Sequence, residues 1–428
     1  MSILAILPML ILGVGIYFLI RLRFFFILHP IKALKKTFSS GFSGAERRAF
    51  SLALAGTLGV GNIVGVAYGI SVGGAGCLFW IFISGLFSSV IKYCESTLGA
   101  NFAKEGRGGM MYVIAASVGR LGRALGGAYS LLCLLLALFM GAALQSQSVA
   151  VAASAALGFE PYVFSVLFAA LVFITVRGGV KKIEGATAAV IPIATIVYVI
   201  ICLAVIASGE VSLSSVLVKI FRDAFSAGSA AGGVLAFLSS NAMREGFARG
   251  LLSNEAGAGT SSAAQSRSRG EHPARVGLFG VWEVFFDTTL LCTLTGLAVL
   301  CSGVDAAQSG IMTVLSAFGT VLGSFAPIIL FVLIFAFAYS TVVCWYFYAS
   351  EALVFLFLRE RGAIFTVLFF SFLLFGTAFP EGMLMLFVDS VLFVMSILTL
   401  FALIKNSERI VFLSEQYGLL KSKHSDMR

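Results

Sequence analysis

Gly56-Thr57-Leu58-Gly59-Val60-Gly61-Asn62 interrupts an apolar stretch in which a membrane helix would otherwise be continuous. Three glycines and an asparagine within seven residues weaken the helical backbone. Lipid offers no hydrogen bonds to a broken backbone, so such a break is tolerated only where it is buried in protein or lines a wet cavity. The stretch therefore predicts an unwound helix inside a membrane protein.

A second interruption is predicted at residues 241–246, Asn-Ala-Met-Arg-Glu-Gly. The polar residues of this segment, with Ser239 and Ser240 before it, are costly in lipid and are expected to face the protein interior. On a regular helix the adjacent Arg244 and Glu245 would diverge by about 100°, so we expect unwinding or another partner for one of them. Two interrupted helices in matching halves of a membrane protein point to the central site of a transporter.

The run from Ser253 to Gly257 is interpreted as a cap and turn, in which Ser253 or Asn254 begins a short inner helix. This is a structural role, and we favour it over ligand contact at these residues.

The composition predicts an all-α integral membrane protein. The chain is 59% hydrophobic and 11% charged, whereas soluble domains have about 25% charged residues. Its apolar runs are long enough to cross the roughly 30 Å hydrocarbon core, and no polar stretch is long enough for a separate soluble domain. We predict eleven spans, at about 3–20, 49–73, 76–99, 127–156, 162–176, 186–208, 229–250, 276–302, 325–357, 363–380 and 383–405.

The charge distribution predicts the topology. If the first span runs from outside to inside, most of the 29 basic residues lie in inner loops or the tail, including Arg269, Arg359, Arg361, Lys421, Lys423 and Arg428. The positive-inside rule then places the N-terminus outside and the C-terminus in the cytoplasm. We expect a multi-pass protein of the cell membrane, the bacterial inner membrane. The net charge of +9 is explained by an anionic inner leaflet and calls for no nucleic-acid partner.

The first break suits a zwitterion and a cation together. The half-helix that starts near Gly61 and Asn62 presents N–H groups and a positive dipole end to an anion. The half-helix that ends near Thr57 leaves carbonyl oxygens free for a cation. A carboxylate and a sodium ion would fill these two positions. The alternative is close helix packing through small residues, which is common in membranes.

Four later spans carry further candidate site residues. Gln145 and Ser148 lie three residues apart and share a helix face, where ligand contact and interhelical hydrogen bonding are equally plausible. Tyr339, Ser340 and Thr341 are followed by Trp345 on the face of Thr341, and their hydroxyls suit a hard cation or merely bond the preceding turn. Asp287 and Asp389 are candidates for ion coupling or for pairing with arginine.

No enzyme chemistry is indicated. The seven cysteines lie in or beside predicted spans without a CxxC pair, and the three histidines lie in inner loops. We therefore expect no cofactor and no metal beyond a sodium ion as the coupling ion, and no recognisable nucleophile and base occur together. A channel would be expected to show a symmetric ring of charged or carbonyl groups instead of an asymmetric pair of broken helices.

These segments together resemble the alanine or glycine:cation symporter family, the sodium:alanine symporters. The motifs that carry the resemblance are LAGTLGVGN (54–62), GGAGCLFWIFISGL (73–86), GRGGMMYVI (106–114), ARGLLSNEAGAGT (248–260), DTTLLCTLTG (287–296) and AYSTVVCW (338–345). The similarity covers about residues 10–405. The chain departs from the family pattern at Val60, where threonine is usual, at Gln147, at residues 260–262, and between Pro380 and Asp389, which lack a tryptophan.

The resemblance implies a leucine-transporter-like fold of about eleven transmembrane helices, with five-plus-five inverted repeats and an extra N-terminal helix. The single transporter domain, 1–428, would comprise an N-terminal helix and basic segment (1–48), two repeats (49–208 and 209–405) and a cytoplasmic tail (406–428). It implies sodium-coupled symport of alanine or glycine, by a protein that is possibly a monomer in the lipid bilayer. Proton-coupled symport or exchange of a related amino acid is the alternative.

The resemblance also implies roles for individual residues. The residues expected at the substrate are Thr57, Gly59, Gly61, Asn62, Gln145, Ser148, Gly246, Phe247 and Trp345. Gly246 and Phe247 would lie at the second break. The residues expected at sodium are Gly56, Leu58, Ser340 and Thr341.

Overall fold

The computed structural model describes residues 6–38, 41, 43–158, 160–226, 240–268, 271–306, 310–358 and 362–420. Apart from one β-bridge between Lys104 and Arg107, the secondary structure of these residues is helical. Ser239 and the first part of the seventh predicted span, 229–239, lie outside the described residues, as do Arg269, Arg359, Arg361, Lys421, Lys423 and Arg428.

The first half of the chain contains one bent pair of helices, three long apolar segments and two shorter apolar helices. Its elements are α1 (Leu7–Arg21), α2 (Phe25–Leu28), α3 (Pro30–Phe38), α4 (Gly44–Thr57), η2 (Val60–Asn62), α5 (Val64–Gly73), α6 (Gly76–Asn101), α7 (Met110–Ser117), η3 (Gly119–Leu121), α8 (Gly122–Leu136), η4 (Ala137–Leu144), α9 (Gln145–Leu157), α10 (Pro161–Arg177) and α11 (Val180–Ser208).

The described part of the second half contains three long apolar segments and one shorter apolar helix, together with α14 and the turn that follows it. Its elements are α12 (Leu213–Ser226), α14 (Asn241–Asn254), α15 (Ser262–Gln265), α16 (Pro273–Val284), η5 (Phe285–Cys292), α17 (Thr293–Cys301), α18 (Gly310–Leu322), η6 (Gly323–Phe325), α19 (Ala326–Phe357), α20 (Ala363–Leu374), η7 (Gly376–Ala378), α21 (Glu381–Lys405) and α22 (Ser407–Gln416).

The helices agree with the predicted spans wherever the chain is described. Six continuous helical segments are long and apolar enough to cross a bilayer, the bent pair α4 and α5 makes a seventh, and α1, α10 and α20 are shorter apolar helices. These account for ten of the eleven predicted spans. The seventh predicted span is described only from Ser240, as α14.

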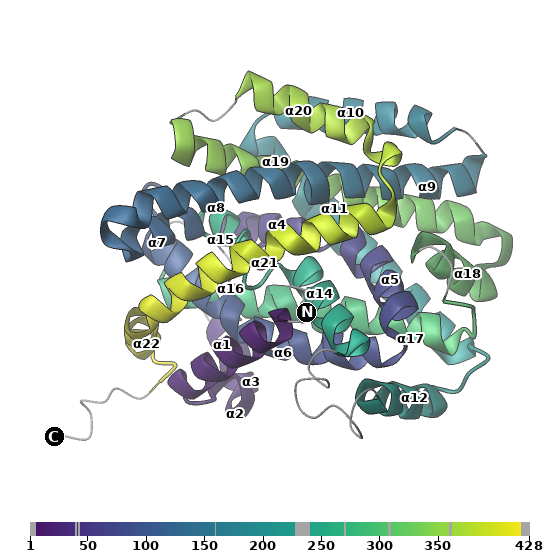
Figure 1. Ribbon diagram of the computed structural model, residues 1–428, viewed down its shortest axis with the longest axis horizontal. Coiled ribbons are helices and arrows are strands. Elements are labelled where there is room, and N and C mark those ends of the chain that lie inside the picture. Colours follow the sequence, from purple (N-terminus) through teal and green to yellow (C-terminus); the bar gives the residue numbers. More distant parts are fainter. Residues whose placement is uncertain are drawn as a thin grey trace.

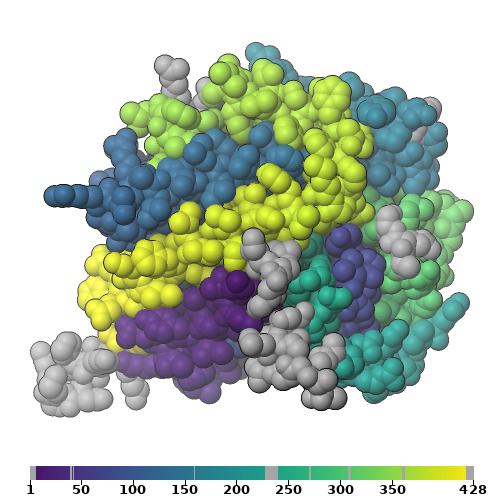
Figure 2. Space-filling model, viewed as in Figure 1, coloured from purple at the N-terminus to yellow at the C-terminus, as the bar shows by residue number. Residues whose placement is uncertain are grey.

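The broken helices lie inside the bundle. α6 packs against α14 and α16, and α19 packs against α4, α9 and α11. In Figure 1, α10 and α20 lie together at one edge and α12 lies at the opposite edge. Figure 2 shows the yellow helix α21 running between the blue α8 and α9 on one side and the purple α1 on the other. All seven cysteines are buried and free, as their apolar positions predicted.

Candidate functional site

The first predicted break is present. α4 begins at a capping box, in which Ser43 and Glu46 bond each other's backbone N–H, and it ends at Thr57. α5 continues after the single turn η2 at an angle of 53°. The side chain of Asn62 holds the turn, because its Oδ1 accepts the N–H of Gly59 at 3.2 Å. This explains why an asparagine follows the glycines: it replaces hydrogen bonds that the helix has lost.

The second predicted break is not found at residues 241–246, and the interruption that the structure describes is the turn already expected after residue 253, which we call the second break below. α14 is regular from Asn241 to Asn254, so the prediction of an unwound segment at residues 241–246 is wrong. The chain leaves the helix at Glu255, whose φ is 54°, and turns through Gly257 and Gly259, whose φ values are 100° and 75°. Glycine is favoured at such angles because it has no Cβ to clash. The short helix α15 starts only at Ser262.

Four expectations for this segment change accordingly. Gly246 and Phe247 lie within α14 and not at a break; Gly246 packs closely on Trp80, and the Phe247 ring is 6.2 Å from the Trp80 ring. Arg244 and Glu245 do approach each other, at 3.5 Å, although the helix is regular. The turn after residue 253 is present, but Ser253 and Asn254 end α14 instead of starting the inner helix.

The two breaks meet at Asn62. Its Nδ2 donates to Ser253 Oγ at 3.2 Å, to the main-chain oxygen of Asp287 at 3.0 Å, and to the Asp287 carboxylate. That carboxylate also accepts the hydroxyls of Ser253 (2.6 Å) and Thr288 (2.8 Å). Asp287 is fully buried. Its carboxylate accepts hydrogen bonds from uncharged groups only, and among the described residues it forms no ion pair. A buried carboxylate of this kind is costly unless its surroundings are polar, and it marks a functional site in a membrane.

Two π-helical stretches aim side chains at the first break. η4 precedes Gln145, and η5 contains Asp287. An extra residue in a helical turn re-orients the side chains around it and is frequent at functional sites. Gln145 Oε1 accepts the N–H of Val60 at 3.3 Å. Ser148, in contrast, donates to Leu144 O of its own helix at 2.9 Å.

Trp345 is fully buried. Its Cβ lies so close to Gly141 that a side chain at position 141 would clash with it. Its ring meets that of Tyr348 edge to face at 5.4 Å. Gly56 in turn lies directly against the Tyr348 hydroxyl. The expected residues Thr57, Asn62, Gln145 and Trp345 are therefore all buried around one break.

Oxygen atoms from α4 and α19 face each other at the end of α4. Thr341 Oγ1 lies 3.0 Å from the carbonyl oxygen of Ala55 and 3.3 Å from that of Leu58. The neighbouring Ser340 Oγ lies 2.9 Å from the carbonyl oxygen of Phe337, in the preceding turn of the same helix. Hydroxyl and carbonyl oxygens are the ligands that hard cations take. Of the two carbonyls that Thr341 contacts, that of Leu58 was expected, and that of Ala55 lies one residue before the expected Gly56.

Ion pairs join helices on both sides of this centre. On the α5 side, Arg249 of α14 is bonded to Asp389 of α21 with both side chains buried, and its guanidinium lies 5.5 Å from the Tyr68 ring. On the α4 side, the buried Glu184 of α11 lies 3.4 Å from the exposed Arg48 and 2.8 Å from Arg267. The two sets of contacts therefore lie beside different half-helices of the broken span.

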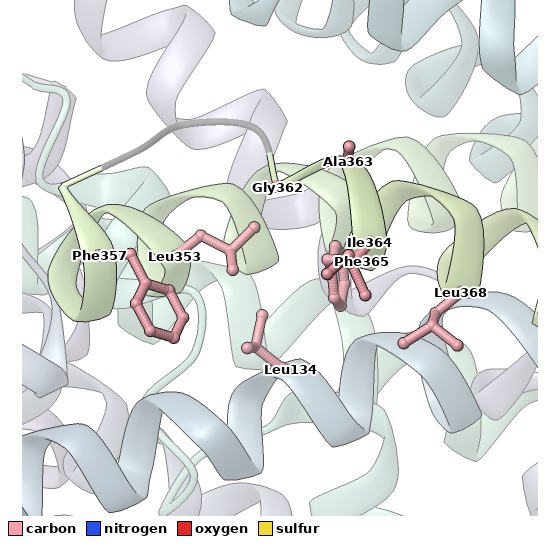
Figure 3. Close-up of a pocket in the computed structure, with 8 residues that line it drawn as sticks. All are labelled: Leu134, Leu353, Phe357, Gly362, Ala363, Ile364, Phe365 and Leu368. Atoms are coloured by element: carbon pink, nitrogen blue, oxygen red, sulfur yellow. The ribbon is translucent and has the colours of Figure 1, made fainter.

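Two hollows lie outside the centre. One of about 760 Å³ lies between α8, the end of α19 and the start of α20, and its lining is entirely apolar (Figure 3). It offers no partner to a charged solute. Another, of about 260 Å³, is lined by Arg107, Arg267, Ser350 and Glu351, on the same side as Glu184.

Comparisons with known proteins agree with this arrangement. Residues 1–427 match the model of the sodium:alanine symporter family. An uncharacterized transporter of Bacillus subtilis, YflA, is 30% identical over 96% of this chain and 92% of its own. The sodium/alanine symporter AgcS of Methanococcus maripaludis is 30% identical over 81% of this chain and 80% of its own.

Among solved structures, MhsT in complex with L-phenylalanine covers 89% of this chain and 90% of its own, with a TM-score of 0.58 at 17% identity. At that identity the match shows the fold alone, and it confirms the predicted leucine-transporter-like class. A multi-pass helical bundle, two breaks that meet in its interior and a family match along almost the whole sequence lead to one assignment: this chain is a membrane transporter and belongs to the sodium:alanine symporter family.

Proposed function

We propose that this protein is a sodium-coupled symporter that carries a small neutral amino acid, alanine or glycine, into the cell. The observation that carries the proposal is the approach of Thr341 Oγ1 to the carbonyl oxygens of Ala55 and Leu58, at 3.0 and 3.3 Å. A sodium ion between these atoms would bind α19 to the end of α4. The hydroxyl of Ser340 and the carbonyl of Phe337 supply further oxygens one turn away.

The amino acid is proposed to bind at the other end of the break. Its carboxylate would face the N–H groups near Gly59 and Gly61, where the dipole of the following half-helix is positive. Gln145 and Asn62, which now bond this backbone, would direct the solute's polar groups. Trp345, Gln145 and Asn62 are buried around this position, and close packing of this kind would favour a small solute such as alanine or glycine.

Alternating access would follow if the two sets of ion pairs, at Arg249 and at Glu184, opened in turn. Opening of the Arg249–Asp389 contact would expose the site to the outside, and opening of the Glu184 contacts would expose it to the cytoplasm. The assignment of one contact to the outside and the other to the cytoplasm assumes that the N-terminus lies outside the cell membrane. It also assumes two inverted repeats, 49–208 and 209–405. Sodium entry supplies about 2.3 kcal/mol per 100 mV and about 1.4 kcal/mol per tenfold gradient, which is sufficient for accumulation.

Uptake into proteoliposomes tests the proposal. Labelled L-alanine and glycine should accumulate when sodium is imposed outside, and should only equilibrate when sodium is equal on both sides. Lithium and potassium serve as control cations. Accumulation that follows a pH step and ignores sodium would contradict the sodium assignment and favour the proton-coupled alternative.

A further inference from the structure

The chain between α1 and α4 runs along the outside of the bundle. It turns sharply after α1, at Arg23 and Phe24, which both adopt a left-handed φ of 53°. It then forms α2 and α3, which lie near α1 and α22 (Figure 1). We call residues 24–38 the α2–α3 segment. None of its residues takes part in the proposed contacts with sodium or the amino acid.

The α2–α3 segment exposes a series of large apolar side chains. Phe24, Ile27, Leu28, Ile31 and Leu34 are each between 41 and 68% exposed. Single exposed apolar residues are ordinary, but a contiguous set marks a surface that meets a partner or a membrane. In a chain whose neighbouring helix α1 is itself apolar, lipid is the partner that this set fits.

The helix α3 divides its side chains among three faces. At 3.6 residues per turn, Ala33 and Thr37 share one face, and both are buried. Ile31 and Leu34 lie on a second face and are exposed. The lysines at positions 32, 35 and 36 occupy the remaining arc. A helix with an apolar face beside a basic face suits the boundary between lipid headgroups and acyl chains.

The charge of this part of the chain is entirely positive. Residues 21–36 contain five basic residues, and no acidic residue precedes Glu46. Lys32 and Lys35 are exposed, and among the described residues neither forms an ion pair within 4.0 Å. The surface helix α12, in contrast, carries Asp223 beside Arg222. Charge complementarity therefore favours an anionic partner for α3, and the adjacent apolar face favours an anionic lipid over a soluble anion.

Buried polar contacts join the end of α3 to α4. Arg275 of α16 donates to the main-chain oxygen of Gly41 at 2.6 Å and lies 3.1 Å from Glu46, in the first turn of α4. Trp282 of the same helix donates to Thr37 Oγ1 at 3.1 Å. The side chains of Arg275 and Glu46 are at most 6% exposed. Since α4 ends at the first break, a force that fixes α3 also fixes the start of the broken span.

We propose that the α2–α3 segment binds acidic phospholipids of the inner leaflet. Its exposed apolar side chains enter the acyl region, and the ammonium groups of Lys32 and Lys35 contact lipid phosphates. The predicted topology puts the segment on the cytoplasmic side, where lipid charge attracts basic segments. Lipid binding holds α3 and, through Arg275 and Glu46, the start of α4 in the closed form described here. This inference goes beyond the proposed function and does not depend on which solute is carried.

The first test uses the full-length protein in detergent micelles to which phosphatidylglycerol or phosphatidylcholine is added. Phosphatidylglycerol should raise the midpoint of thermal unfolding of the wild type by several degrees more than phosphatidylcholine does. Added KCl should reduce the difference, because salt screens the charges. Lys32→Gln/Lys35→Gln should lose most of the difference. Lys219→Gln/Arg222→Gln removes two exposed charges from α12, so it is the matched control and should respond as wild type.

A second measurement identifies what covers the apolar face. In proteoliposomes, a fluorophore on Ile31→Cys should be quenched by brominated acyl chains more strongly than one on Lys32→Cys, about 100° further round the helix. The seven native cysteines are buried, which limits their labelling.

Equal stabilisation by the two lipids, or an undiminished response of Lys32→Gln/Lys35→Gln, would overturn the inference. Cross-linking of Ile31→Cys between two copies, without quenching by lipid, would also overturn it and would assign the face to a second copy of the chain. Neither measurement requires transport, so a failure of sodium symport would leave this inference intact.

Discussion

Arg249 of α14 and Asp389 of α21 form an ion pair in which both side chains are at least 95% buried. Glu245, one turn before Arg249, adds a second carboxylate at 3.6 Å, and the Tyr68 ring of α5 covers the guanidinium. Three helices are thereby joined on one side of the first break. In the proposed alternating-access cycle, this contact would form the outer gate.

Asp389→Asn should therefore destabilise the closed protein. Breaking a buried ion pair typically costs about 3–5 kcal/mol, and because Glu245 still lies beside Arg249 we expect the midpoint of thermal unfolding in detergent to fall by an amount near the lower end of this range. The exposed pair of Arg222 and Asp223 offers a matched control, because Asp223→Asn should change stability by about 0–1 kcal/mol. Equal midpoints for Asp389→Asn and the control would show that the buried pair does not hold the closed form.

On the other side, Glu184→Gln should favour opening toward the cytoplasm. The glutamine removes a charge that Arg48 and Arg267 share, at 3.4 and 2.8 Å. A cysteine substituted for Ser350, in the polar hollow beside Arg267, reports the opening. We expect thiol labelling of Ser350→Cys to become about tenfold faster when Glu184→Gln is added, for a shift of about 1.4 kcal/mol. An unchanged labelling rate would argue against a gate at Glu184.

The sequence located the first break and misplaced the second, for a physical reason. At residues 56–62 the glycines weaken the helix whatever lies around them, so local sequence is sufficient. At residues 241–246 the charges were read as helix breakers. They are satisfied within a regular helix, because Glu245 lies 3.5 Å from Arg244 and 3.6 Å from Arg249, one turn later. The better signal was the pair Gly257 and Gly259, which adopt positive φ.

The predicted cation contacts show a second limit of prediction from the sequence. Thr341 was found from its hydroxyl and its place in a family motif. Ala55 was missed because it contributes a main-chain oxygen, and a main-chain atom leaves no mark on residue identity. The pairing of Asn62 with Ser253 and Asp287 was likewise hidden, since it joins residues 191 and 225 positions apart.

His272 gives a pH dependence outside the membrane spans. It caps α16 by accepting the N–H of Ala274 at Nδ1, which requires an unprotonated nitrogen, and burial lowers its pKa. Unfolded histidine binds its proton near pH 6.5, so the cap's contribution is fully present above about pH 6.5 and is lost as the pH falls through the lower pKa of the folded state. Thermal unfolding at about pH 7.5 and 5.5 should show a larger loss for wild type than for His272→Asn, which keeps an acceptor but does not titrate. Equal losses of thermal stability in wild type and His272→Asn would show that His272 does not contribute to destabilisation by acid.

Thr341 distinguishes a cation site from ordinary helix packing. Thr341→Val keeps the volume and removes the oxygen that faces Ala55 and Leu58, whereas Thr341→Ser keeps the oxygen and removes a methyl group. An oxygen contact to a charged partner contributes about 1.5–3 kcal/mol, so the valine variant should need about 10- to 100-fold more sodium for half-maximal uptake. The serine variant should stay within a few-fold of wild type. If packing were the role of this residue, the order would reverse, because serine leaves a small cavity and valine does not. Sodium-dependent thermal stabilisation in detergent provides a second reading that does not depend on transport, and it should be lost in the valine variant alone.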